Sequence, residues 1–270
     1  MTASTAAPTR SAVVVALEQT WALTVRSSMA TVRNPANWMP GLIFPLVMAA
    51  VYASQFADAT QLPEFPKVDS FLQFVLPAAI LQGIAFNAAN AGSDMAIDIE
   101  TGFFDRLMSS PVARQSVLIG RVGGAAFSAG VQAIVLMIVF LLFGAPVKSG
   151  IGGAIAIVII SILLAIALSG FGLAVAMRTG SSEATQSMFP LIFVMIFISS
   201  AFFPTQLMRG WYRTVAELNP FTKIIDPTRE LVITGWSWSD LGQAVSITLL
   251  VAFVSLSLAY RTYLGRLKNA

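Results

Sequence analysis

Seven charged side chains are gathered in one short segment, residues 94–121, which lies between two long apolar stretches. They make up 7 of its 28 residues, whereas charged residues are 11% of the whole chain. Carboxylates and guanidinium groups at this spacing can pair with each other or with the charges of a partner. The chain has no histidine and no cysteine, so it lacks the commonest general base and any thiolate metal ligand. We therefore expect this charged island to recognise a partner and not to catalyse a reaction.

Within the charged island, residues 99–110 can form a short helix that is broken by Ser109-Ser110-Pro111. Gly102 lowers the helix propensity by about 1 kcal/mol relative to alanine, so we expect it to allow a close approach of the backbone, either to the N-terminal helix or to another protein. Two phenylalanines follow it on a segment that should face water, which favours a partner surface over a loop that packs only on its own chain. The predicted contact residues are Glu100, Gly102, Phe103, Phe104, Asp105, Arg106, Leu107 and Pro111.

The composition is that of an integral membrane protein. The 270 residues are 56% hydrophobic, and the 11% that are charged fall well below the share of about 25% in soluble domains. A spanning helix needs about 20 mostly apolar residues. Such runs predict six spans in an all-α fold, at residues 38–57, 70–93, 122–143, 151–177, 187–203 and 241–260, within one transmembrane domain, residues 1–270.

The orientation of the spans follows from their positive charges. An even number of spans puts both termini on one side, and that side carries ten of the sixteen Lys and Arg residues. Four of the other six lie in one long segment, so the short loops opposite hold only Lys67 and Lys148. The positive-inside rule therefore predicts cytoplasmic termini, a cytoplasmic charged island and a place in the plasma membrane. The positive charge indicates topology and not nucleic-acid binding.

Residues 11–33 are expected to form an amphipathic helix that lies in the cytoplasmic interface. Leu17, Trp21, Val25, Met29 and Val32 recur at helical spacing and form an apolar stripe, with the charged residues elsewhere. The helix can serve as a plain membrane anchor. Alternatively, its polar face packs on the charged island and transmits force.

Residues 204–239 are too long and too apolar for a simple loop. Residues 209–218 can form one short helix stopped by Asn219-Pro220, and residues 226–233 a second, with Asp226 as N-cap. Both pieces are shorter than a span, and nearby tryptophans fit an interfacial belt. We expect two helical pieces that dip into the outer leaflet. The alternative is an extracellular cap with a structural role, and a buried Asp226–Arg229 pair fits either.

No charged residue falls in the middle of any predicted span, which disfavours an ion-coupled transporter. Neutral polar and aromatic residues remain as candidates for a cargo path. One face of the second span combines amides with an aromatic ring, and a stripe of Phe189, Phe193 and Phe197 runs along the fifth. The alternative is helix packing with the amides bonded between spans. The predicted path residues are Gln82, Phe86, Asn87, Asn90, Phe193 and Phe197. Gly120, Gly124 and Ser128 follow a spacing typical of close helix packing.

The chain has no phosphate-binding loop of the G-x-x-x-x-G-K-[ST] type and no paired carboxylates within the predicted spans. We therefore expect no ATP hydrolysis and no hydrolase chemistry on this chain. Any energy for transport has to come from a partner.

The island sequence Glu-Thr-Gly-Phe-Phe-Asp-Arg-Leu-Met-Ser-Ser-Pro-Val-Ala-Arg, followed by Gly120-Arg121, resembles the loop between spans two and three of ABC-2 type transporter permeases, in particular of the drug-exporting, daunorubicin-resistance type. The pattern of that family is acid, any residue, glycine, two mostly apolar residues, acid, base and leucine, then Ser-Pro, a base and Gly-Arg. The resemblance extends over the whole chain. It also includes Asn219-Pro220-Phe221-Thr222 and the Asp226–Arg229 spacing, which in the family belong to re-entrant helices between spans five and six.

The resemblance implies that residues 99–110 are the coupling helix, which sits in a groove of a separate ATP-binding subunit. It further implies that Asp98 or Glu100 pairs with Arg26 or Arg33. Two ATPase subunits would bind ATP and magnesium, and two permease copies, or this chain with a similar permease, would pair in the bilayer. The cargo would be a hydrophobic drug or lipid-like compound, as in multidrug efflux and antibiotic resistance. Two alternatives remain open, a lipid-linked polysaccharide exporter and, in another class, a secondary transporter or membrane scaffold that needs no ATPase.

Overall fold

The computed structural model describes residues 11–269, and this part of the chain is helical without a strand. The element bounds are α1 Ala12–Arg33, α2 Pro35–Gln55, η1 Ala57–Gln61, α3 Phe71–Glu100, α4 Phe103–Met108, α5 Arg114–Leu142, α6 Gly150–Thr179, α7 Ser182–Gln186, α8 Met188–Ile198, η2 Thr205–Leu207, α9 Gly210–Leu218, α10 Pro220–Ile233 and α11 Trp238–Asn269. The predicted all-α class is confirmed.

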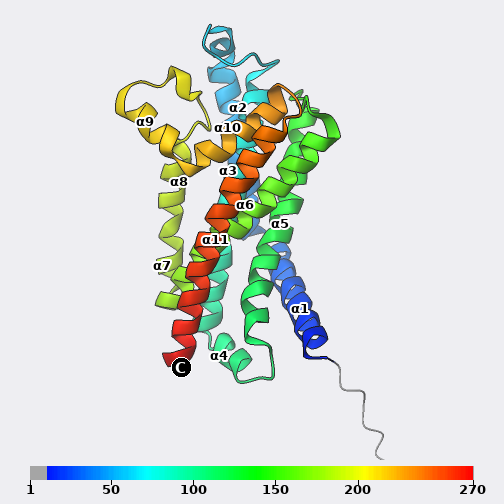
Figure 1. The fold of residues 1–270 in the computed structure, drawn as a ribbon, viewed down its shortest axis with the longest axis vertical. Coiled ribbons are helices and arrows are strands. Elements are labelled where there is room, and N and C mark those ends of the chain that lie inside the picture. Colours follow the sequence, from blue (N-terminus) through cyan, green and yellow to red (C-terminus); the bar gives the residue numbers. More distant parts are fainter. Residues whose placement is uncertain (1–10, 270) are drawn as a thin grey trace, which may run out of the picture.

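The long helices run along the long axis of the molecule (Figure 1). The short helix α4, the start of α1 and the end of α11 lie together at one end, which we call the lower end. The turn after α2 and the short helix α9 lie at the opposite, upper end. The charged island thus lies at the same end as the C-terminal residues, which is what an even number of crossings requires.

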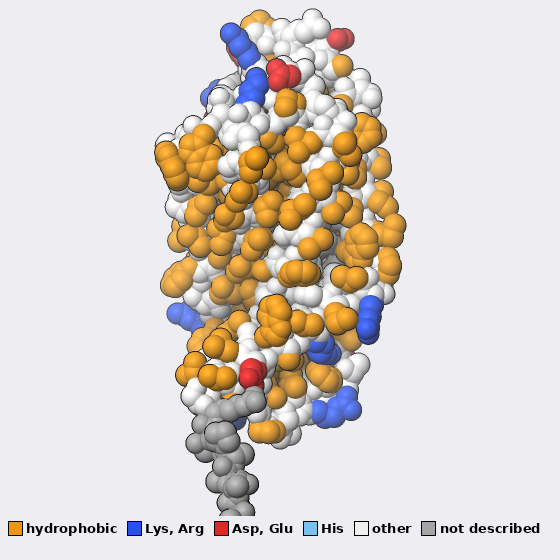
Figure 2. Space-filling model, turned by 90° about the vertical axis from the view of Figure 1, so that its right-hand side faces the viewer, with side chains coloured by type: hydrophobic (Ala, Val, Ile, Leu, Met, Phe, Trp, Pro, Cys, Tyr) orange, Lys and Arg blue, Asp and Glu red, His pale blue; other side chains and the backbone are white. Residues whose placement is uncertain are grey.

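The surface has the charge distribution of a membrane protein. On the face shown in Figure 2, hydrophobic side chains cover the middle of the molecule, whereas Lys, Arg, Asp and Glu gather towards the two ends. Large apolar side chains point outward from the middle of the long helices, among them Val131 of α5, Ile155 of α6 and Phe253 of α11. Such a wide apolar surface fits hydrocarbon and not water.

Five helices in the described part of the chain are long and apolar enough to cross a membrane, namely α2, α3, α5, α6 and α11. Five of the six predicted spans coincide with them to within two residues at the predicted ends that pass the helix bounds. The remaining span, residues 187–203, falls on a shorter apolar stretch, Ser182–Ile198, which is divided into α7 and α8. Pro190 has no N–H to donate to the carbonyl of Gln186, and the helix is broken at Ser187, between these two residues.

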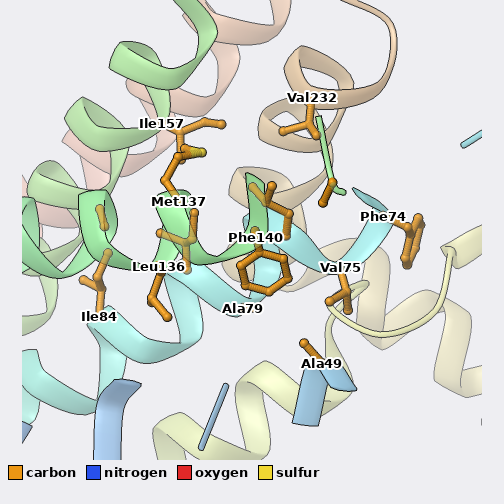
Figure 3. Close-up of a cluster of buried hydrophobic side chains, with 14 of the residues drawn as sticks. Ala49, Phe74, Val75, Ala79, Ile84, Leu136, Met137, Phe140, Ile157 and Val232 are labelled. Atoms are coloured by element: carbon orange, nitrogen blue, oxygen red, sulfur yellow. The ribbon is translucent and has the colours of Figure 1, made fainter. Parts of the chain in front are cut away.

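Helix α3 is the centre of the bundle, since 89% of its most apolar window is buried, compared with 17% for α2. Figure 3 shows one cluster of the core, to which Phe74 and Ile84 of α3, Leu136 of α5, Ile157 of α6 and Val232 of α10 contribute. Most of the α3 surface therefore meets protein. The helices around it keep one apolar face for the membrane.

Small residues and a proline explain how α2 approaches α3. A Cβ atom on Gly41 would lie 2.9 Å from the carbonyl oxygen of Gly83, so neither position has room for a side chain. Pro45 has no N–H, and the carbonyl of Gly41 four residues earlier therefore lacks its helical donor. The amide Nε2 of Gln132 on α5 supplies that hydrogen bond at 2.7 Å. A carbonyl inside a membrane bundle needs such a partner.

The outer segment has the two predicted helices, but the second begins earlier than expected. Helix α9 ends at Leu218, as predicted, whereas α10 starts at Pro220 and not at Asp226. Asn219 caps α10, because its Oδ1 accepts a hydrogen bond from the N–H of Phe221 at 2.9 Å. The prediction that Asp226 is the N-cap is therefore wrong, and Pro227 lies inside the helix.

Candidate functional site

The turn between α3 and α4 depends on Gly102. This residue has φ of 68° and ψ of 10°, the left-handed conformation that glycine adopts without strain. A Cβ atom built on it would meet nothing within 4 Å. The expected reason for this glycine, a close approach of two backbones, is therefore wrong within the chain. The turn itself requires it, and the short helix predicted over residues 99–110 is α4, which starts at Phe103 and not at residue 99.

The two phenylalanines of α4 have different environments. Phe104 is 2% exposed and packs on Tyr263 of α11, with ring centroids 6.3 Å apart. The expectation that both rings face water is therefore wrong for Phe104, which anchors α4 to the bundle. Phe103 is half-buried, and the guanidinium of Arg26 lies 4.1 Å from its ring centroid. Within residues 102–111, the exposed residues are Asp105, Arg106, Ser109 and Pro111.

A cluster of four charges joins α1, α3 and α5 at the lower end. Asp98 of α3 accepts hydrogen bonds from Arg26 of α1, at 3.3 and 3.4 Å, and from Arg121 of α5. Arg121 also lies 3.6 Å from the carboxylate of Asp94. Asp98 thus pairs with Arg26 and not with Arg33, which decides between the pairings that the sequence left open. Two carboxylates and two guanidinium groups balance, so the cluster carries no net charge.

Helix α1 lies against the lower half of α5 with its small and polar residues. A Cβ atom on Gly120 would be 2.6 Å from the Leu23 side chain, and one on Gly124 would be 2.4 Å from Ser27. The Gln19 amide bonds the Pro111 carbonyl at 3.0 Å, next to α4. The apolar stripe, including Trp21 at 69% exposure, points outward. The predicted packing of the polar face on the charged island is confirmed, and so is close packing at Gly120 and Gly124.

Glu100, the last residue of α3, makes a second connection. Its carboxylate accepts hydrogen bonds from the backbone N–H of Ser182, at 2.6 Å, and from its hydroxyl, at 3.2 Å. Ser182 is the first residue of α7, which leads into α8. Glu100 therefore connects the turn before α4 to α7, which leads into the helix that carries Phe189 and Phe193.

An aromatic pocket of about 380 Å³ opens between α2, α3 and α8. Phe86 of α3 stacks on Phe189 and Phe193 of α8, with centroids 4.8 and 6.1 Å apart. Phe44 of α2 meets Phe86 edge-on at 5.4 Å. The row continues to Phe197, whose centroid is 4.5 Å from that of Phe193. The walls of this aromatic pocket are formed by Ala36, Asn37, Pro40, Gly41, Phe44, Phe86, Asn90, Phe189 and Phe193.

Three predicted polar residues of the cargo path have different positions around this pocket. Asn90 is in its wall and donates a hydrogen bond to the Asn37 carbonyl at 2.7 Å. Asn87 lies behind the wall and donates to Gln132. Gln82 is 1% exposed, and neither atom of its amide has a hydrogen-bond partner among the described residues.

A buried arginine joins the outer segment to the core. Arg229 of α10 donates hydrogen bonds to the carbonyls of Phe74 and Ser200, at 3.0 and 2.6 Å, and to Asp226 at 2.7 Å. Burial lowers the pKa of Arg229 to about 10, and the Asp226 carboxylate opposes that shift, so the guanidinium is charged at neutral pH. The predicted Asp226–Arg229 pair is therefore present. Next to it, the side chain of Asn219 bonds the Met195 carbonyl at 2.6 Å and ties α10 to α8.

Some residues of the site were not predicted, namely Asn37, Phe44, Arg121 and Gln132. Gln132 and Arg121 had a signal in the sequence, since each is a polar side chain inside or next to an apolar run, where it needs a partner. Phe44 and Asn37 had none, because a single aromatic or amide residue on a spanning helix does not show which neighbour it meets.

The comparisons with known proteins agree with the geometry. The family model described as ABC-2 type transporter matches residues 18–233. The chain is 25% identical over 230 residues to "Daunorubicin resistance ABC transporter permease protein DrrB1" of Streptomyces coeruleorubidus, which covers 85% of this chain and 78% of that protein. It is also 25% identical over 247 residues to "Putative transport permease ycf38" of Porphyra purpurea, at 86% and 84% coverage. The ycf38 protein of Cyanophora paradoxa is 24% identical over 235 residues, at 83% and 78%.

Proposed function

The chain belongs to the ABC-2 type transporter family, and from this premise we propose that it is the permease subunit of an exporter for hydrophobic drugs or lipid-like compounds. ATP would be hydrolysed by a separate ATPase subunit, which also binds the magnesium. The observation that carries the proposal is the aromatic pocket between α2, α3 and α8. Its volume of about 380 Å³ suits one drug-sized molecule, and its ring faces suit an aromatic or lipid-like one.

The ATPase would dock at the lower end. Asp105, Arg106, Ser109 and Pro111 are exposed there around the half-buried Phe103, and Phe104 fixes α4 to α11 from inside. A polar, charged rim next to one aromatic ring is the composition of a docking surface that is not permanently buried. The positive-inside rule places this end in the cytoplasm of a cell whose plasma membrane the chain crosses. The stretch α7–α8 would complete a sixth crossing.

Force would pass from α4 to the pocket by two routes. Arg26 and Arg121 hold Asp98, so α1 and α5 move with the end of α3. Glu100 holds the start of α7, so α8 moves with it as well. A shift of α8 against α2 would change the access to the aromatic pocket, as in the domain movements of other transporters. Two permease copies and two ATPases would form the working complex, and α9 and α10 would dip into the outer leaflet as re-entrant helices at the exit.

The test is reconstitution of the full chain with a candidate ABC-type ATPase subunit from the same organism, in vesicles loaded with a fluorescent aromatic dye. We expect ATP-dependent efflux, which Phe193→Ala reduces at least several-fold, because it removes the central ring of the pocket. Leu191→Ala is the matched control, since Leu191 is 61% exposed on the same helix. Equal efflux with and without ATP would contradict the proposed ATP-driven export. An equal loss in both variants would exclude the aromatic pocket as the cargo site.

A further inference from the structure

The aromatic pocket is bounded on one side by the first turns of α2, a helix with Pro40 and Pro45 in its interior. Each proline lacks an N–H, so the carbonyl four residues earlier loses its helical donor. For Pro45 this is the Gly41 carbonyl, to which Gln132 donates a hydrogen bond at 2.7 Å. For Pro40 it is the carbonyl of Ala36, and no side chain among the described residues replaces the missing donor. One backbone acceptor of α2 is therefore free.

The free carbonyl of α2 faces the aromatic pocket. Helical carbonyls point along the axis towards the residue four positions later, so the oxygen of Ala36 points towards Pro40. Both residues line the pocket, and both are exposed. The proline ring also clashes with a carbonyl at this position, which turns it outward from the helix axis. A group bound in the pocket can therefore reach this oxygen.

The rest of the wall favours a neutral donor on an aromatic cargo. Four phenylalanines contribute to it, and its described residues include no Lys, Arg, Asp or Glu. Asn90 donates with its Nδ2 group to the Asn37 carbonyl, so its remaining amide atom, Oδ1, can only accept. Ala36 is the second residue of α2, and the positive end of the helix dipole disfavours a cationic group there. A hydroxyl group therefore fits this wall better than an ammonium group.

We propose that the aromatic pocket selects cargo that carries a hydroxyl group, which donates a hydrogen bond to the Ala36 carbonyl while the aromatic part lies against the phenylalanines. The inference rests on the proposed function and adds a rule for cargo choice. A cargo with a methyl group at the same place displaces water from the carbonyl without replacing its hydrogen bond, and an unpaired carbonyl inside a membrane bundle is costly. Pro40 is then a specificity-determining residue, because another residue at this position would supply an N–H to the acceptor.

The test uses two fluorescent probes of the same shape, 9-anthracenemethanol and 9-methylanthracene, and the purified full chain in lipid nanodiscs. The measured quantity is the ratio of the two affinities, corrected for partition into empty nanodiscs. Pro40→Ala supplies the missing N–H to Ala36, and we expect it to lower the preference for the alcohol about fivefold to tenfold, the effect of one hydrogen bond. Pro40→Leu supplies the same N–H and fills the space of the ring, so we expect a similar loss. Pro77→Ala, the same change inside α3 and outside the pocket wall, should leave the ratio unchanged.

The outcomes separate the hydroxyl contact from the pocket. Phe193→Ala should weaken the binding of both probes and leave their ratio unchanged, because this ring contacts the part that the probes share. If both probes bind and neither Pro40 variant changes the ratio, the Ala36 carbonyl does not bind the hydroxyl group and the inference is wrong, while the proposed function stands. If neither probe binds to the wild type, the aromatic pocket is not a cargo site, and the proposed function and the inference both fail. If neither Pro40 variant folds, the wild type decides alone, and equal affinities for the two probes contradict the inference.

Discussion

Glu100 and Ser182 join the turn before α4 to the segment that leads into α8 and the wall of the aromatic pocket. The carboxylate of Glu100 accepts a hydrogen bond from the backbone N–H of Ser182 at 2.6 Å. Ser182 starts α7, which ends at Gln186, and α8 follows and carries Phe193. The Ser182 hydroxyl donates a second hydrogen bond to the same carboxylate, at 3.2 Å. Under the proposed function, a movement of α4 would reach the pocket through these hydrogen bonds as well as through α3 itself.

Ser182→Pro should uncouple the two ends without unfolding α7. Ser182 is the first residue of α7, a position that proline favours, and Ser181 before it has φ of −121° and ψ of 126°, which suits a following proline. The substitution removes the N–H that Glu100 holds. We expect basal ATPase activity of the complex to persist, while cargo-stimulated activity and efflux fall several-fold. Glu183→Ala, at the next and exposed position, is the control. Unchanged efflux in Ser182→Pro would show that the bond transmits nothing.

The charge cluster should tolerate the loss of one arginine far better than the loss of the other. Arg121 has 8% of its side chain exposed, and replacement by Met leaves Asp94 and Asp98 with Arg26 alone, which should destabilise the fold by roughly 3–5 kcal/mol. Arg26 has 45% exposed, so Arg26→Met should cost about 1 kcal/mol or less. Denaturation in mixed micelles measures both values. Equal costs would contradict the assigned order of burial.

The contact of α1 with α5 should depend on the glycines of α5. A side chain at Gly120 would meet Leu23 at 2.6 Å, so Gly120→Leu should separate α1 from α5 and expose α1 to added protease. Gly265→Leu is the matched control, because no atom lies within 4 Å of a Cβ at Gly265 in α11. The control should be neutral, or stabilising by about 1 kcal/mol, since glycine is a poor helix former. Protection of α1 that survives Gly120→Leu would disprove the close packing.

The sequence predicted those features that depend on local periodicity. Five spans, the amphipathic helix over residues 11–33 and the end of α9 at Leu218 follow from apolar runs, an apolar stripe and the Asn219-Pro220 stop. The close packing at Gly120 and Gly124 followed from their spacing of four, which puts both on one face of a helix.

The features that were missed depend on contacts between distant elements. Phe104 is buried because Tyr263 lies over it, and a helix of six residues is too short for its pattern to show which face meets α11. The start of α10 was placed late because Asn219 both follows α9 and caps α10, while Asp226-Pro227 offers a competing start signal. The role of Gly102 in a left-handed turn, instead of a close approach, required the backbone angles.

Arg229 should not be replaceable by lysine. Its planar guanidinium spreads donors to the carbonyls of Phe74 and Ser200 and to Asp226, and an ammonium group at the end of a flexible stem cannot reach all three in that fixed arrangement. The Ser200 carbonyl lies just after the end of α8, where no further helical turn supplies a donor. If this carbonyl loses the hydrogen bond from Arg229 inside the bundle, the structure is destabilised.

We expect Arg229→Lys to lower the thermal midpoint and loosen α10, whereas Lys223→Arg, at an exposed position of the same helix, should have no effect. A cysteine placed at Thr228, which is 0% exposed on α10 of this cysteine-free chain, would report the loosening as faster labelling by a membrane-impermeant maleimide. Wild-type labelling rates in Arg229→Lys would show that charge alone suffices at this position.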